Sequence, residues 1–113
     1  MDGVNPHRLL LELCTGAEPQ ARRAATGCAV AASLVSRRFD GRPLERDPAP
    51  SEVARARQRF PDAAIMLYLK RGQALAREMK WLGSYRYAVV NMGGANEDAL
   101  NRRYAEIRSM LGF

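Results

Sequence analysis

Apolar residues recur at helical spacing through much of this chain. When residues 62–83 are plotted at about 100° each, one side collects Ile65, Tyr68, Leu69, Gly72, Leu75, Ala76, Met79 and Leu82. A continuous apolar arc of this kind is typical of an amphipathic helix. Gly83 follows as a suitable C-terminal cap. The pattern therefore predicts one long helix over residues 62–83.

Residues 19–39 show a different pattern, because nearly every side chain between Ala24 and Val35 is apolar and small. A helix that is apolar all round is usually buried. Pro19 suits the first turn of such a helix. The sequence therefore predicts that residues 19–39 form the central helix of the fold.

Shorter helical segments are expected over 5–16, 51–60 and 96–113. Asn5, Ser51 and Asn96 are favourable N-terminal caps. Pro61 ends the second of these segments. Between residues 40 and 50 the chain has three prolines and a glycine, which predicts a surface loop.

These elements predict an all-α fold: a helical bundle of five or six helices around the central small-residue helix, in a single compact domain over residues 1–113. Residues 84–92 leave an alternative open. Tyr85, Ala88 and Met92 have helical spacing, whereas Tyr85, Tyr87 and Val89 alternate as in a strand. We favour a helix, because in an all-α fold only a second chain would supply a partner strand.

The residues that usually carry catalysis or metal binding are sparse. His7 is the only histidine, and Cys14 and Cys28 lie on separate predicted helices without metal-binding spacing. We expect two buried, reduced thiols. A single histidine cannot build a zinc site and leaves nucleophilic triads without a base. The sequence therefore predicts a protein that is not an enzyme and holds no cofactor or metal.

The chain begins without a basic lead-in to an apolar segment, so no signal peptide is recognised. Its longest uncharged run, "AATGCAVAASLVS", is much shorter than the ~20 residues of a membrane span. We expect a cytoplasmic protein that does not contact membranes.

The chain is basic, with 18 Lys and Arg against 12 Asp and Glu and a net charge of +6. Residues 37–59 carry seven cations and four carboxylates, and residues 60–82 carry four and two. The middle of the chain therefore holds five of the six surplus charges. A basic surplus of this size indicates an acidic partner.

One set of cations lacks local counter-charges. Lys70, Arg77 and Lys80 share an arc with Trp81 on the predicted helix, and no carboxylate lies three or four positions from any of them. Cations neutralise phosphates, and an aromatic side chain can stack on a base. We therefore predict a nucleic-acid-binding surface here, which four arginines would extend: Arg37, Arg38, Arg55 and Arg59.

The favoured function is a basic helical module that contacts a nucleic-acid backbone, as an accessory subunit of a nucleoprotein assembly or a small regulator. The alternative is a protein–protein interaction module: an adaptor, an inhibitor of an acidic protein or an obligate homodimer. Because aromatic and methionine side chains suit interface cores, its contact residues would be Met66, Leu67, Tyr85 and Tyr87. The sequence leaves open DNA against RNA, sequence specificity and oligomeric state.

Overall fold

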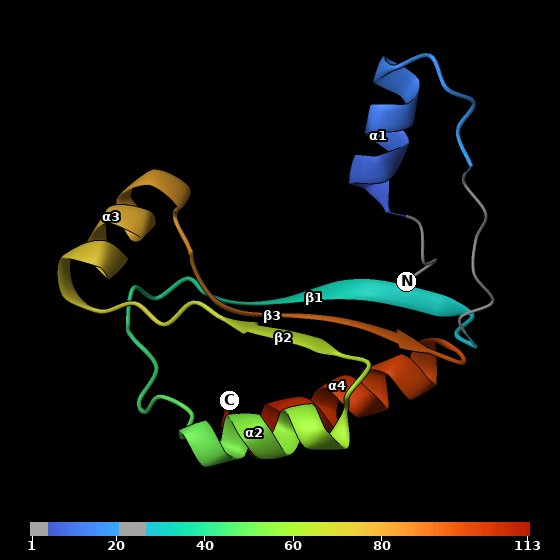
Figure 1. Ribbon diagram of the computed structural model, residues 1–113. Coiled ribbons are helices and arrows are strands. Elements are labelled where there is room, and N and C mark those ends of the chain that lie inside the picture. The colour runs from blue at the N-terminus through green and yellow to red at the C-terminus, as the bar shows by residue number, and fades with distance from the viewer. Residues whose placement is uncertain (1–4, 21–26) are drawn as a thin grey trace.

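A computed structural model describes residues 5–20 and 27–113. The elements follow the order α1 (Pro6–Cys14), β1 (Val30–Arg38), α2 (Pro50–Arg59), β2 (Ala64–Leu67), α3 (Gly72–Leu82), β3 (Tyr85–Gly94) and α4 (Glu97–Leu111) (Figure 1). The described residues form four helices and a three-stranded antiparallel sheet. The prediction of an all-α helical bundle is therefore wrong, and the fold belongs to the α+β class.

β3 is the central strand of the sheet, whose order is β1-β3-β2. It pairs antiparallel with β1, from Val30 opposite Gly94 onwards, and with β2, where Ile65 lies opposite Val90. The strand alternative for residues 84–92 is therefore correct. Both partner strands come from the same chain, so no second chain is needed to complete the sheet.

The expected central helix is replaced in its second half by β1, which is an edge strand. Along β1, Ala32, Leu34 and Ser36 are at least partly covered, whereas the residues between them are exposed. A short apolar run is compatible with a strand as well as with a buried helix, and periodicity alone does not separate the two. Residues 21–26 of the expected helix lie outside the described residues.

The expected long helix over residues 62–83 is divided into β2, an extended segment and α3. The extended segment continues the pairing with β3, since Tyr68 N donates to the Tyr87 carbonyl at 2.9 Å. Gly72 begins α3 with φ of +54°, a left-handed value that favours glycine. This glycine thus marks the start of α3 and does not lie inside a longer helix.

Helices α2 and α4 cover one face of the sheet (Figure 1). The main core lies between these layers and contains Ala56, Phe60, Ile65, Val90, Met92, Leu100, Ile107 and Leu111. A second cluster lies at the α3 end of the sheet and contains Leu44, Leu75, Tyr85, Tyr87 and Ala88. A hydrogen bond of 2.5 Å between Ser36 Oγ and Tyr104 Oη ties β1 to α4.

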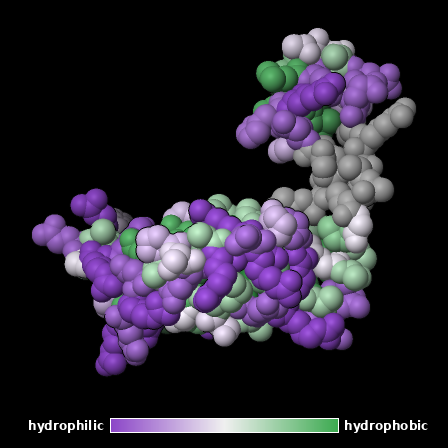
Figure 2. Space-filling view, turned by 60° about the horizontal axis from the view of Figure 1, so that its bottom comes forward, coloured by the Kyte–Doolittle hydropathy of each residue, from purple (hydrophilic) through white to green (hydrophobic). Residues whose placement is uncertain are grey.

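Apart from α3 at one end of the sheet, no helix of the described residues packs on the opposite face, which we call the open face. Helix α1 lies on this side but stands apart from the sheet (Figure 1), and none of its residues is buried. Figure 2 shows its hydrophobic side chains at the surface. Cys14 of α1 is exposed, so the expectation of a buried thiol is wrong for this residue.

Replacement of Ile107 by alanine tests the sheet–helix core. Ile107 is fully buried between α4 and the sheet. We expect Ile107→Ala to lower the free energy of unfolding by about 2–5 kcal/mol, because it removes buried methyl groups and leaves a cavity. Urea denaturation followed by circular dichroism measures this change.

The matched control is Leu82→Ala, since Leu82 is 63% exposed at the end of α3. Its expected cost is below about 1 kcal/mol. Equal losses in the two variants would contradict the placement of α4 against the sheet.

Candidate functional site

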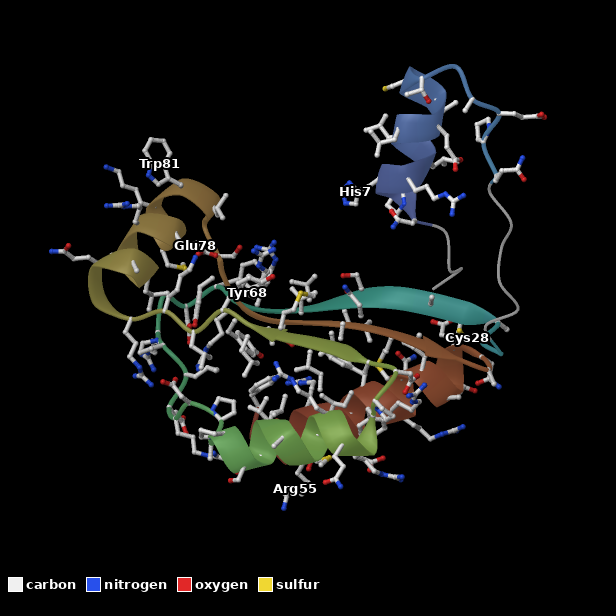
Figure 3. The ribbon with its side chains drawn as sticks, viewed as in Figure 1. His7, Cys28, Arg55, Tyr68, Glu78 and Trp81 are labelled. Carbon is white, nitrogen blue, oxygen red and sulfur yellow. The ribbon has the colours of Figure 1, made fainter. Side chains whose placement is uncertain are left out.

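The outer side of α3 exposes an aromatic side chain together with two cations. Leu75 anchors α3 to the sheet, because it packs in the hydrophobic cluster around Tyr85 of β3. Trp81 is 76% exposed and projects away from the sheet (Figure 3). Arg77 and Lys80 are also exposed, and their spacing of three and four residues places them with Trp81 on one arc. The predicted grouping of these three side chains is thus present on α3.

Lys70 lies before the start of α3 and does not share the surface of Arg77, Lys80 and Trp81. Its ammonium forms an ion pair with Glu78, whose other carboxylate oxygen accepts a bond from the Arg86 backbone N–H at 3.4 Å. The hydrogen bond from Lys70 is the main cause that lowers the pKa of Glu78. Because the chain is extended before α3, a carboxylate eight residues ahead reaches Lys70. The expectation that Lys70 lacks a counter-charge is therefore wrong.

Most carboxylates of the described residues are already engaged in ion pairs. Arg71 pairs with Asp47 at 2.8 Å, for example, and so does not belong to the α3 arc. The carboxylates engaged in this way are Glu12, Asp40, Asp47, Glu52, Asp62, Glu78 and Glu106. No described carboxylate pairs with Arg77 or Lys80. The surplus positive charge of the chain thus includes these two side chains.

A second basic feature lies on the open face beside the end of α3. Arg37 of β1 and Arg86 of β3 are direct cross-strand partners. Arg37 donates to Ser84 Oγ at 2.9 Å, and the Arg86 guanidinium lies 4.3 Å from the centre of the Tyr68 ring. Like charges directly opposite each other destabilise a sheet. Arg37 and Arg86 thus place two positive charges at this end of the open face, and the charge of Arg86 also acts on the nearby Glu78 carboxylate.

Sequence reasoning identified Arg37 but missed Arg86 and Tyr68. The alternation of Tyr85, Arg86 and Tyr87 was the available signal, since in a strand it places the arginine opposite the two tyrosines. Only the sheet pairing brings Arg86 over Tyr68.

The other arginines proposed from the sequence lie elsewhere. Arg38 pairs with Asp40 at 3.1 Å, and Arg59 pairs with Glu106 at 3.2 Å. Arg55 projects from the outer side of α2, on the opposite side of the sheet from Trp81 (Figure 3). The predicted set of cations is thus divided between two faces of the molecule.

The four residues proposed for a protein interface do not form one surface. Tyr85 and Tyr87 are buried, with 1% and 7% of their surface exposed. Tyr85 Oη accepts a hydrogen bond from Lys70 N at 2.7 Å, so this tyrosine has a structural role. Met66 lies on the open face, whereas Leu67 packs against the core.

A hollow of about 540 Å³ lies between β1 and the end of α4, lined by Arg38, Leu44, Glu45, Arg46, Tyr87, Gly112 and Phe113. Its two arginines already pair with Asp40 and Glu52.

Within residues 5–20 and 27–113, no three His, Cys, Asp or Glu side chains gather as metal ligands. In the same ranges, no helix has the length and apolar character needed to cross a bilayer.

The fold and this surface define an α+β protein whose three-stranded sheet is covered by two helices on one face and carries a basic, aromatic region at one end. Comparison with protein-family models, with curated proteins and with solved structures gives no match for this chain. A function for this chain is therefore inferred from the geometry of its own residues.

The start of α2 contains a contact that is sensitive to acid. Glu52 accepts two hydrogen bonds from Arg46, at 2.7 and 2.9 Å, and one from the Ala49 backbone N–H at 2.8 Å. The bonds from Arg46 are the main cause that lowers the pKa of Glu52 to about 2. The expected cap Ser51 is therefore wrong: α2 starts at Pro50 after the N-cap residue Ala49, whose backbone N–H donates to Glu52.

This contact predicts a loss of stability in acid. In the unfolded chain a glutamate has a pKa of about 4.3. Because the pKa of Glu52 is lower than this in the folded state, its ionised form stabilises the fold at pH values above about 4.3. The contribution decreases as the pH falls towards about 2. We expect Glu52→Gln to be less stable than the wild type at pH 7 and to show a shallower loss between pH ~5 and pH ~2. Urea denaturation across this pH range measures both effects.

Glu45→Gln is the control, because Glu45 is exposed and forms no ion pair with another described residue. It is expected to follow the wild-type pH profile. A wild-type profile in Glu52→Gln as well would show that the Arg46–Glu52 contact does not stabilise the fold.

Proposed function

We propose that this protein is a non-enzymatic basic module that contacts a nucleic-acid backbone, as an accessory subunit of a nucleoprotein assembly or a small regulator. The contact region, which we call the α3 surface, consists of Arg77, Lys80 and Trp81 on α3 and of Arg37, Arg86 and Tyr68 on the adjoining end of the open face. Lys70 and the arginines of α2 do not belong to it.

The observation that carries the proposal is the pair of cations next to the exposed tryptophan. Arg77 and Lys80 have no carboxylate partner among the described residues. Most carboxylates of the described chain are already engaged in ion pairs with other cations. Exposed cations of this kind bind phosphates and release counterions from the nucleic acid. Trp81 offers a ring on which an unpaired base can stack.

The arginines of the open face support the same proposal. A phosphate between Arg37 and Arg86 would relieve their mutual repulsion and accept charge-assisted hydrogen bonds from both. Ser84 and Tyr68 hold these guanidinium groups in place. The groups are therefore ordered before a ligand binds, which reduces the entropy lost on binding.

The protein-interaction alternative is not supported by the residues first assigned to it, because Tyr85 and Tyr87 are in the core. A protein partner would have to use other residues.

Replacement of the two α3 cations tests the proposal. We expect the wild type to bind fluorescein-labelled single-stranded or duplex oligonucleotides at low salt, with affinity that falls as salt rises. Arg77→Ala/Lys80→Ala should weaken binding by about tenfold or more at 50 mM salt and reduce the slope of log K against log salt by about 1.5–2. Fluorescence anisotropy measures both, and quenching of Trp81, the single tryptophan, reports contact at α3.

The matched control removes the same charge from the helix layer. Arg55 and Arg102 are exposed on α2 and α4, so Arg55→Ala/Arg102→Ala should change the affinity by less than about threefold. No binding at low salt in the wild type would contradict the proposal. So would equal losses in the two double variants, because binding would then depend on net charge and not on the α3 surface.

A further inference from the structure

Helix α1 exposes an apolar face that has no cover in the described part of the chain. Leu10, Leu11 and Leu13 are 59%, 66% and 58% exposed. Arg8 and Glu12 form an ion pair at 2.8 Å on the other side of the helix. An isolated helix of fewer than about 12 residues is marginal in water and needs packing of its apolar face. With only nine residues, α1 therefore requires a surface to pack on.

The open face of the sheet is a surface of matching character. The outward residues of β1 are Ala31, Ser33 and Val35, of which Val35 is 44% exposed. A sheet face that is permanently in water usually carries polar or charged residues at these positions. Here they are small or apolar, and they stay free of charge until Arg37.

The open face is also slightly hollowed where the first half of β1 adjoins β3. A depression of about 290 Å³ is lined by Ala31, Ala32, Ser33 and Asn91. The Asn91 Oδ1 atom is buried in this region and has no hydrogen-bond partner among the described residues. Small side chains beneath a depression leave room for large aliphatic side chains, such as leucine, from an opposing element.

We propose that α1 docks through its leucine face onto the open face of its own sheet and covers Ala31, Ser33 and Val35. Helix α1 already lies on this side of the sheet (Figure 1). Residues 15–29 join it to β1, and fifteen residues span up to ~50 Å. The nine residues of β1 extend over only about 30 Å. The connection is therefore long enough for α1 to reach any part of the open face.

The tether selects the chain's own helix over the helix of a second copy. Two elements joined by only fifteen residues of the same chain meet at an effective concentration in the millimolar range, far above the micromolar concentration of a competing copy. The docked helix would be about 14 Å long and would cover about half of β1. Arg37 and Arg86 at the far end stay accessible, so this inference does not depend on the proposed nucleic-acid contact.

Hydrogen exchange of the intact chain, followed by mass spectrometry, tests the docking. The amides of α1 should exchange at least about tenfold more slowly than those of a synthetic peptide of residues 5–16. The protection should be the same at 1 and at 50 µM protein, which distinguishes the chain's own helix from a second copy. Leu10→Glu on α1 and Val35→Glu on β1 should each abolish it, because either places a charge in the apolar contact.

Ala54→Glu, at an exposed position of α2, adds the same charge away from the open face and should leave α1 protected. The amides of β3, read in the same experiment, show whether each variant is folded. Peptide-like exchange of α1 in the wild type would overturn the inference. Protection that increases with protein concentration alongside a dimer in sizing chromatography, or that survives Val35→Glu in a folded chain, would also overturn it.

Discussion

The rest of the structure depends on the pairing of β3 with strands on both of its sides. β1 and β2 each pair with β3, and the residues of β3 that face α2 and α4, such as Val90 and Met92, are almost completely buried. The helices pack on a surface that exists only when all three strands are paired. Helix α3 lies in the connection between β2 and β3, and it places Glu78 beside Lys70 and the Arg86 backbone. The fold is thus organised around contacts between distant parts of the sequence.

Those distant contacts explain which elements could be predicted from the sequence. The helices α1, α2 and α4 were predicted near their observed ranges, because apolar spacing and, for α1 and α4, the capping residues are local signals. Asn5 and Asn96 accept hydrogen bonds from the first-turn amides that they were expected to cap. The strands were read as helices, because their apolar runs also fit a helix and their partners lie many residues away. Gly72 was the local sign that the expected helix over residues 62–83 is interrupted, since an interior glycine costs about 1 kcal/mol in a helix.

The residues of the candidate site likewise divide into those that local spacing predicts and those that distant contacts bring together. Arg77, Lys80 and Trp81 stay together because their spacing lies within one real helix. Lys70 separates from them because it precedes Gly72 in an extended segment, where helical spacing does not apply. Arg86 meets Tyr68 only through the register of the sheet. Spacing rules thus identify a surface correctly inside one element, and they do not identify surfaces that two elements form together.

The distribution of residues along the open face follows from the cost of burying charge. An arginine that is covered without a carboxylate partner loses its hydration, and this costs several kcal/mol. The cross-strand pair Arg37 and Arg86 therefore belongs at an end that stays in water. Ala31 and Ser33, nearer the start of β1 and the connection to α1, can be covered without that cost. The open face thus has a half of small, uncharged residues and a basic half, and the change between them falls after Val35.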